Sequence, residues 1–185
     1  NKDKLYDFLR DMEFNRLLSQ AISFYGEPRN KDFNKKTQLK KNNKINTKTY
    51  KTVLKKKQLD ELIKKLDEKS VISVDTETSS LNPLEADLVG ISLCYEANQA
   101  YYIPLGHKEK TELKKNLVLK KLKPILEDTS IKKVGQNIKY DFIIFKNENI
   151  ELNPIDDTML LSYTLDAGNN RHNMDTLSEL HLGHK

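Results

Sequence analysis

One eight-residue stretch, Val71–Thr78, constrains the fold of this chain more than any other part of the sequence. It opens with a short apolar run bounded by polar residues, a pattern typical of a buried β-strand. Side chains two apart on a strand point to the same face, so Asp75 and Glu77 are predicted to project together from its end. Neither residue has a Lys or Arg beside it in the sequence. Two such carboxylates predict a site for a divalent cation such as Mg²⁺, which prefers carboxylate oxygens and relieves their mutual repulsion.

The segments around this stretch alternate between strand and helix patterns. Short apolar or alternating runs predict strands over residues 50–54, 71–76, 88–95, 100–104 and 131–135. Helical spacing of apolar residues predicts a helix ending near residue 69 and further helices over 112–127, 138–147, 156–165 and 174–181. Three strands in succession, the last two joined by a hairpin at 96–99, indicate an antiparallel part of the sheet. The pattern as a whole predicts an α/β sandwich with a mixed central sheet.

The chain begins with a different kind of sequence. Residues 3–24 place apolar side chains at helical spacing, so residues 1–24 are expected to form an amphipathic helix. Residues 25–49 are rich in Lys, Asn, Thr and Gln and contain few large apolar side chains, which is the composition of a basic flexible linker. We expect the main domain to occupy residues 50–185.

Charge is distributed unevenly along the chain. Residues 1–70 carry 19 Lys or Arg and 10 Asp or Glu, whereas residues 71–185 carry 13 and 17, although the whole chain has a formal charge of +5. A basic extension beside an acidic, metal-binding region suits a polyanionic substrate such as nucleic acid. A Lys-rich segment also fits a solvated linker, and the sequence leaves both interpretations open.

Several classes of protein are excluded by the sequence. No apolar run is long enough to cross a membrane and no secretion signal opens the chain, so we expect an intracellular protein in the cytoplasm. The single cysteine, Cys94, excludes an internal disulfide and a multi-cysteine zinc site, and it is expected to be a buried, unreactive thiol. The spacing of the four histidines does not indicate a metal site.

A second chemically informative segment runs from Val134 to Asp141. Its glycine follows a short strand, and Asn137 is a plausible cap for a helix on which Asn137 and Asp141 share one face. By itself this arrangement also fits a capped, solvated helix start. Together with Asp75 and Glu77, however, Asp141 supplies a third carboxylate, and three carboxylates from a strand end and a nearby helix predict a binuclear metal site.

At this point the chain resembles the 3′→5′ exonuclease domains of bacterial DNA polymerase I, within the DEDD exonuclease superfamily. These domains have a ribonuclease-H-like fold. The matching blocks follow the family's order and spacing over residues 50–185: Val74–Thr78 with Ser80-Leu81, Leu88–Ser92, Tyr102–Pro104, Leu122–Leu126, Val134–Asp141, Asp157–Leu160 and Arg171–Asp175. The resemblance implies a ribonuclease-H-like mixed sheet flanked by helices and truncated at the C-terminus. It also implies that residues 1–24 are the tail of a 5′-nuclease region, and residues 25–49 its tether.

The resemblance assigns roles to single residues. Asp75, Glu77 and Asp141 would bind two divalent metal ions, Mg²⁺ or Mn²⁺, and act in catalysis. The third motif of the family, a Tyr four residues before an Asp, has no match before the chain ends. Asp157 and Asp175 are expected to be structural rather than substitutes for that missing ligand. The resemblance therefore predicts that this stretch alone is inactive.

Substrate contacts are implied in the same way. Leu81 would wedge against the terminal base, and the same cleft would be lined by Gln136, Asn137 and Tyr140. Arg171 would reach a phosphate, although capping of the next helix or pairing with Asp175 fits it equally well. The expected partners are DNA, above all single-stranded 3′ ends, and the polymerase region of the same polypeptide. The alternative is a noncatalytic module that supports a polymerase and contacts DNA.

Overall fold

The computed structural model describes residues 1–28, 47–106, 111–168 and 170–184. Two compact units make up the chain: Lys44–Leu165, which contains the sheet, and Asn1–Asn43 together with Asp166–Lys185. Most of the predicted linker, residues 29–46 of 25–49, lies outside the described residues, so the linker stays a prediction. In the ranges that are described, no helix is long and apolar enough to cross a membrane.

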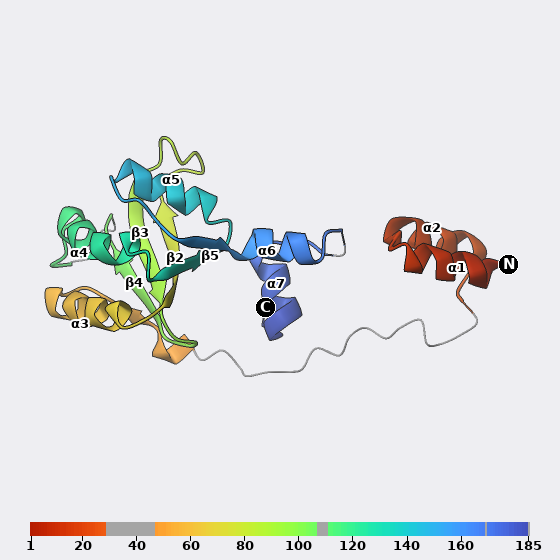
Figure 1. Cartoon of the computed structure of the whole chain (residues 1–185), viewed down its shortest axis with the longest axis horizontal. Coiled ribbons are helices and arrows are strands. Elements are labelled where there is room, and N and C mark those ends of the chain that lie inside the picture. The colour runs from red at the N-terminus through yellow and green to blue at the C-terminus, as the bar shows by residue number, and fades with distance from the viewer. Residues whose placement is uncertain (29–46, 107–110, 169, 185) are drawn as a thin grey trace. The chain divides into compact units, whose positions relative to one another are not determined.

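The sheet of the Lys44–Leu165 unit has six strands in the order β1-β4-β3-β2-β5-β6 (Figure 1). The bounds of the strands are β1 Lys51–Thr52, β2 Val71–Thr78, β3 Leu88–Cys94, β4 Ala100–Pro104, β5 Lys132–Gly135 and β6 Ile155–Asp157. Strands β2, β3 and β4 pair antiparallel, as the succession of strand patterns predicts. The β1/β4, β2/β5 and β5/β6 pairs are parallel, so the mixed sheet is confirmed.

One predicted strand and one predicted helix have different bounds in the structure. The strand expected over residues 50–54 contains only Lys51 and Thr52, which pair with Tyr101 and Tyr102 of β4. The helix expected over residues 156–165 is wrong at its start, because Ile155–Asp157 form β6 and the helix begins at Thr158. Parallel pairing of β6 with β5 decides this conformation, and a three-residue segment that contains two aspartates has no apolar alternation to signal it.

Four helices belong to the same unit: α3 Lys56–Asp67, α4 Lys115–Glu127, α5 Lys139–Asn147 and α6 Thr158–Leu165. The buried residues of α3, α4 and α5 form one apolar cluster with those of β2, β3 and β4. Along β2 the burial alternates, with Ile72, Val74 and Thr76 buried while Val71 is 49% exposed. The core therefore lies on one face of β2, and Asp75 and Glu77 belong to the opposite face.

The single helix predicted over residues 3–24 is wrong, because two helices, α1 Lys2–Asp11 and α2 Asn15–Tyr25, form a hairpin. The chain reverses at Glu13, which adopts a left-handed φ of 56°. Across the hairpin, the buried Tyr6 donates its hydroxyl to the carbonyl of Gly26 at 2.6 Å. A turn residue therefore interrupts a continuous apolar spacing, and of the two helices only α1 has buried side chains, Tyr6 and Leu9.

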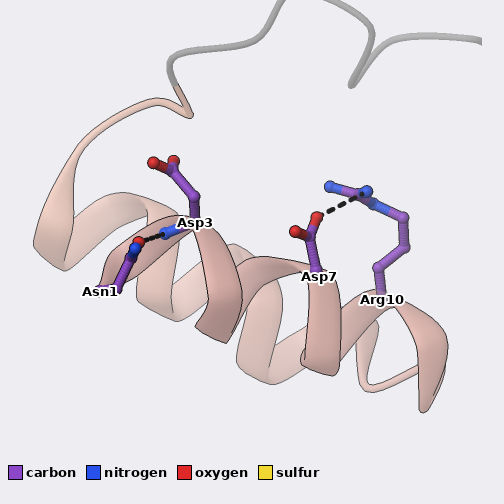
Figure 2. Close-up of polar contacts among 4 residues, drawn as sticks. All are labelled: Asn1, Asp3, Asp7 and Arg10. Carbon is purple, nitrogen blue, oxygen red and sulfur yellow. Dashed lines mark hydrogen bonds and ion pairs between the residues drawn. The ribbon is translucent and has the colours of Figure 1, made fainter.

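Local polar contacts support α1 (Figure 2). The Asn1 side chain accepts a hydrogen bond from the backbone N–H of Asp3 at 3.1 Å and so caps the start of the helix. Arg10 and Asp7 form an exposed ion pair at 3.2 Å one turn apart. Such an exposed pair adds only about 0.3–0.5 kcal/mol to a helix, so packing of the hairpin matters more.

The last helix, α7, spans Met174–Leu182, in agreement with the helix expected over 174–181. Asn173 caps its start by accepting a hydrogen bond from the backbone N–H of Thr176 at 3.2 Å. Gly183 ends it with a left-handed φ of 64°, a conformation that costs glycine nothing.

Candidate active site

The carboxyl end of β2 carries the first two predicted ligands. Asp75 is half-buried and Glu77 is exposed, and both lie on the face of β2 opposite to the buried Thr76. β5 pairs with β2 only as far as Ser73 and Val134, so beyond Ser73 the edge of β2 on that side has no strand partner. The backbone N–H of Thr76 points to this open edge, where the chain that follows β5 can reach it.

Asp141 fills that edge from the first turn of α5. Its Oδ1 accepts the backbone N–H of Thr76 at 2.8 Å and the Thr76 hydroxyl at 2.6 Å. Asp141 is 3% exposed. Both bonds join Asp141 to Thr76, the residue between Asp75 and Glu77.

The turn between β5 and α5 makes this approach possible. A Cβ on Gly135 would lie 3.0 Å from the carbonyl oxygen of Val74 and 3.0 Å from the Ile138 side chain, so a side chain there would require both neighbours to shift by a few tenths of an ångström. Asn137 has a left-handed φ of 56°, and Ile138, not Asn137, is the residue that precedes α5. The predicted Asn137 cap is therefore wrong, and Asn137 does not share a helical face with Asp141.

Two of the three carboxylates, those of Asp75 and Asp141, have raised pKa values. Burial, followed by the negative charges of Asp141 and Glu77, raises the pKa of Asp75 to about 6. Burial also raises the pKa of Asp141, and the charge of Asp157 adds to this rise, while the two bonds from Thr76 oppose it. Within the described residues, no ion pair joins Asp75, Glu77 or Asp141 to a Lys, Arg or His. A cation is thus chemically suited to this group.

Asp75, Glu77 and Asp141 do not form a preorganised metal-binding site in the described residues. Across the parts of the chain that are described, no three Asp, Glu, His or Cys side chains lie close enough together to hold a metal. The donors nevertheless fit a hard cation, because carboxylate oxygens are ligands that suit Mg²⁺ and Mn²⁺.

A cavity of about 510 Å³ opens at the end of β2, where it is lined by Glu77 but not by Asp75 or Asp141. Among the predicted site residues it is lined by Glu77, Leu81, Asn137 and Tyr140. The Leu81 side chain is 97% exposed at its rim. Tyr140 donates its hydroxyl to the carbonyl of Ser80, so α5 holds the start of the loop that carries Leu81.

The remaining predicted site residues lie elsewhere. The side chain of Gln136 accepts a hydrogen bond from the Thr158 hydroxyl at 2.5 Å, and Gln136 does not line the cavity. Arg171 is exposed and belongs to the other compact unit. No ion pair between Arg171 and Asp175 occurs in the described residues, and the cap of α7 is Asn173.

Asp157 has the structural place that the sequence predicts, although it ends β6 and does not lie within a helix. Its Oδ1 accepts the backbone N–H of Met159 at 2.9 Å, at the start of α6, and the backbone N–H of Asn137 at 3.0 Å. Asp157 thus ties β6 to the turn before α5. Its carboxylate also raises the pKa of Asp141, so its charge reaches the site.

Thr76 is the site residue that sequence reasoning missed. The signal was present, because positions 72, 74 and 76 share the buried face of the strand and only Thr76 is polar. A polar side chain on a buried strand face needs a hydrogen-bond partner. Asp141 is that partner, 65 residues further along the chain.

Two solved structures are similar to this chain in fold. The EXO domain of Nibbler from Aedes aegypti is similar with a TM-score of 0.58 and 16% identity, over 77% of this chain and 72% of that one. NrnC of Brucella melitensis with bound Mg²⁺ is similar with a TM-score of 0.51 and 20% identity, over 70% of this chain and 58% of that one. At these identities the similarity establishes the fold, and the predicted ribonuclease-H-like fold is confirmed.

Relatives identified by sequence have higher identities to this chain than these solved structures have. DNA polymerase I of Rhizobium leguminosarum is 42% identical over 62% of this chain and 13% of its own length. DNA polymerase I of Pseudomonas aeruginosa is 41% identical over 73% of this chain and 15% of its own length. The chain thus spans about one seventh of the length of these curated relatives. Residues 50–185 match the family described as 3′-5′ exonuclease. The chain therefore belongs to the family of 3′-5′ exonuclease domains found in A-type DNA polymerases.

Proposed function

We propose that the carboxylates at the end of β2 and the start of α5 form the catalytic site of a proofreading 3′→5′ exonuclease. The observation that carries this proposal is the electrostatics of Asp75: burial, followed by the negative charges of Asp141 and Glu77, raises its pKa to about 6. A protein tolerates such a cluster at a functional site, where a bound cation or a reacting group offsets its cost.

Asp75, Glu77 and Asp141 would hold two divalent ions, Mg²⁺ or Mn²⁺. When bound, such ions neutralise phosphate charge and lower the pKa of a water molecule. The donor chemistry described above supports this assignment. The Brucella structure with a similar fold contains Mg²⁺, which is consistent with it.

The cavity of about 510 Å³ at the end of β2 is proposed to receive the 3′-terminal nucleotide of a single-stranded DNA end. Leu81 would pack against the terminal base, because its side chain is almost fully exposed at the rim. Asn137 and Tyr140, which line the cavity, would contact the nucleotide. Gln136 and Arg171 are proposed to contribute only indirectly, through the turn that precedes α5 or through a phosphate further along the strand.

The overall reaction would be a hydrolysis. Water adds to the phosphorus of the last phosphodiester, and the bond between phosphorus and the 3′ oxygen of the preceding nucleotide breaks. The products are a nucleoside monophosphate and a DNA strand that is one nucleotide shorter with a free 3′ hydroxyl.

Residues 1–185 alone are proposed to be nearly inactive. No three acidic, His or Cys side chains of the described part converge closely enough to hold an ion, so ligands would have to move together on binding. We propose that the polymerase region of a longer polypeptide, as in the relatives, is the natural partner of this domain.

Single-turnover digestion tests the proposal, with a longer polypeptide that contains this domain and the polymerase region in excess over a 5′-labelled single-stranded DNA. We expect stepwise loss of nucleotides from the 3′ end with Mg²⁺ or Mn²⁺ and none with EDTA. Asp75→Ala should abolish the digestion. Asp67→Ala, which removes an exposed carboxylate at the end of α3, should leave it unchanged. Undiminished digestion by Asp75→Ala contradicts the proposal.

The predicted alternative, a noncatalytic module that contacts DNA, has one observation in its favour. That observation is the lack of a ready three-ligand cluster among the described residues. The two functions differ in their response to metal: a noncatalytic module would bind DNA equally well with EDTA and would never shorten it, even in large protein excess.

A further inference from the structure

Two stacked tyrosines lie apart from the candidate active site. The ring centroids of Tyr95 and Tyr101 are 5.4 Å apart, and the rings are inclined by 22°. Their hydroxyl oxygens are hydrogen-bonded at 2.8 Å. Tyr101 is in register with Leu93, which is in register with Val74, so Tyr101 belongs to the buried face of the sheet. Asp75 belongs to the opposite face of the sheet, so the tyrosines are separate from the carboxylates.

Three lysines surround this pair of rings. The Nζ of Lys69 lies 5.4 Å from the centroid of the Tyr95 ring, and that of Lys65 lies 6.0 Å from the same centroid. The Nζ of Lys51 lies 6.0 Å from the centroid of the Tyr101 ring. Aromatic faces attract ammonium groups at these distances. The carbonyl end of α3 also attracts Lys65 and Lys69, but Lys51 comes from β1, so the helix end alone does not explain the cluster.

The positive charge of this cluster is not neutralised by an ion pair. In the part of the chain that the structure describes, no ion pair includes Lys51, Lys65 or Lys69. Burial, followed by the hydrogen bond and the charge of Tyr95, raises the pKa of Tyr101, and the ammonium groups of Lys65 and Lys51 oppose this rise. Ammonium groups gathered around one aromatic pair repel each other, and a bound anion would relieve that repulsion.

A cavity of about 150 Å³ lies at the cluster and is lined by Lys51, Lys65 and Tyr101. It is smaller than the cavities of about 300–1,000 Å³ that enclose drug-sized ligands, so a small anionic group suits it better than a nucleoside. Glu61, one turn before Lys65 on α3, is the acidic residue in its lining. The lining therefore combines two ammonium groups with one carboxylate, and its charge favours an anion.

We propose that Lys51, Lys65 and Lys69 form a phosphate-binding site, which takes a phosphate group of a nucleic-acid backbone or of a free nucleotide. Lysine binds phosphate as a compact point charge, and the ring faces of the two tyrosines hold these charges in place. Such contacts supply affinity without reading sequence. The site goes beyond the proposed exonuclease function, because it requires neither a metal ion nor the carboxylates of β2 and α5.

Backbone amide NMR of the chain in EDTA tests the proposal with two probes, a short single-stranded oligothymidylate and thymidine 5′-monophosphate. We expect the signals of residues 51–53 and 64–66 to shift. Shifts with the oligonucleotide alone identify the backbone as the source of the phosphate, and shifts with the monophosphate alone identify a free nucleotide. The proposal is overturned if neither probe shifts these signals.

Lys51→Gln, Lys65→Gln and Lys69→Gln, combined in one variant, should weaken binding of the probe about 10-fold or more. For the oligonucleotide, the loss of three phosphate contacts should also make the dependence of log affinity on log salt shallower by about 2. The corresponding triple arginine variant keeps the charges and should retain most of the affinity.

The matched control combines Lys56→Gln, Lys64→Gln and Lys120→Gln. These exposed lysines neither lie over the two rings nor line the cavity, and their removal changes the net charge by the same amount. Equal affinity and equal salt dependence of the two triple glutamine variants overturn the proposal.

A change that strengthens binding keeps the test decisive if the triple glutamine variant does not fold. Glu61→Gln removes the carboxylate from the lining of the cavity and should tighten binding about 2-fold to 5-fold. Glu151→Gln removes an exposed carboxylate elsewhere and should leave the affinity unchanged. Equal affinity of Glu61→Gln and Glu151→Gln contradicts the assignment of the phosphate to this cavity.

Discussion

The side-chain amide of Asn147 donates a hydrogen bond to the backbone carbonyl of Pro83 at 2.8 Å. Two turns earlier on the same helix, Tyr140 bonds the carbonyl of Ser80. Helix α5 therefore holds the loop between β2 and β3 at two points, and the exposed Leu81 lies between them. This arrangement leaves the Leu81 side chain free while it fixes the backbone that carries it.

Asn147→Ala should loosen this loop without unfolding the protein. The lost bond is exposed and contributes about 0.5–1 kcal/mol. Amide hydrogen exchange checks this at Glu85, whose N–H bonds the carbonyl of Asn82 within the loop, and we expect exchange to become about 2-fold to 5-fold faster there. Asn170→Ala, which removes an exposed amide bond to Asp166, is the matched control. Unchanged exchange at Glu85 would show that Tyr140 alone holds the loop.

Leu81→Ala should reduce DNA binding without a change in stability. The side chain is 97% exposed, so its truncation removes no packing from the folded state. If it packs against a base, the loss should be about 1 kcal/mol, or roughly 5-fold in affinity. Fluorescence anisotropy of a labelled single-stranded DNA measures this. Leu84→Ala is the control, because Leu84 is 76% exposed on the same loop but does not line the cavity. Equal losses for both variants contradict a specific role for Leu81.

Asp75→Asn should stabilise the metal-free protein near neutral pH. The pKa of Asp75 rises from 3.8 to about 6 on folding, so between these values the folded state keeps a proton that the unfolded state has released. Asp75 therefore lowers stability as pH rises from about 4 to 6, and the full cost, about 1–3 kcal/mol, is present above pH 6. Asparagine carries no charge, so Asp75→Asn removes this free-energy cost.

Urea unfolding in EDTA at pH 4 and pH 7 measures this difference. We expect Asp75→Asn and the unsubstituted chain to have similar stability at pH 4, and the variant to be more stable at pH 7. Asp67→Asn, at an exposed position, corrects for the general effect of removing a negative charge. Equal stability of Asp75→Asn and the unsubstituted chain at pH 7 contradicts the electrostatic account of the site.

The sequence predicts the parts of the fold that depend on local periodicity. Alternating apolar side chains mark β2, because Ile72 and Val74 point into the core while their neighbours do not. Strand β6 has no such signal, since its conformation depends on pairing with β5. The break in the N-terminal hairpin is equally hidden, because Glu13 is an ordinary helix-forming residue that adopts a left-handed conformation only when two helices pack together.

In the candidate site, too, some features could be predicted from the sequence and others could not. The Asp75 and Glu77 pair can be predicted from strand geometry, and Asp141 from the family motif. The bond that joins the two segments could not be predicted, because it depends on where β5 ends relative to β2. The place of Asn137 was also hidden, since an Asn before a helix usually caps it, whereas here its backbone N–H is held by Asp157 from β6.

The ammonium group of Lys133 is buried in the Lys44–Leu165 unit. Its Nζ donates to the backbone carbonyls of Asp128 at 2.7 Å and Ile131 at 2.6 Å, and also to that of Asn153. Burial lowers its pKa to about 8. The side chain is fully buried, so Lys133 joins the end of α4, the start of β5 and the segment before β6 from the inside.

Lys133→Met should destabilise the protein by about 1–3 kcal/mol at pH 7. Methionine has a similar shape and avoids the cost of burying a charge, which alone would favour the variant. The buried carbonyl of Ile131 and the partly buried carbonyls of Asp128 and Asn153 would lose that donor, and we expect this loss to dominate. Lys132→Met is the matched control, because Lys132 is exposed and only pairs with Asp156 at 2.9 Å, so its loss should cost less than about 1 kcal/mol. Urea unfolding of both variants decides the question, and a Lys133→Met protein as stable as the unsubstituted chain would show that desolvation of the ammonium outweighs its bonds.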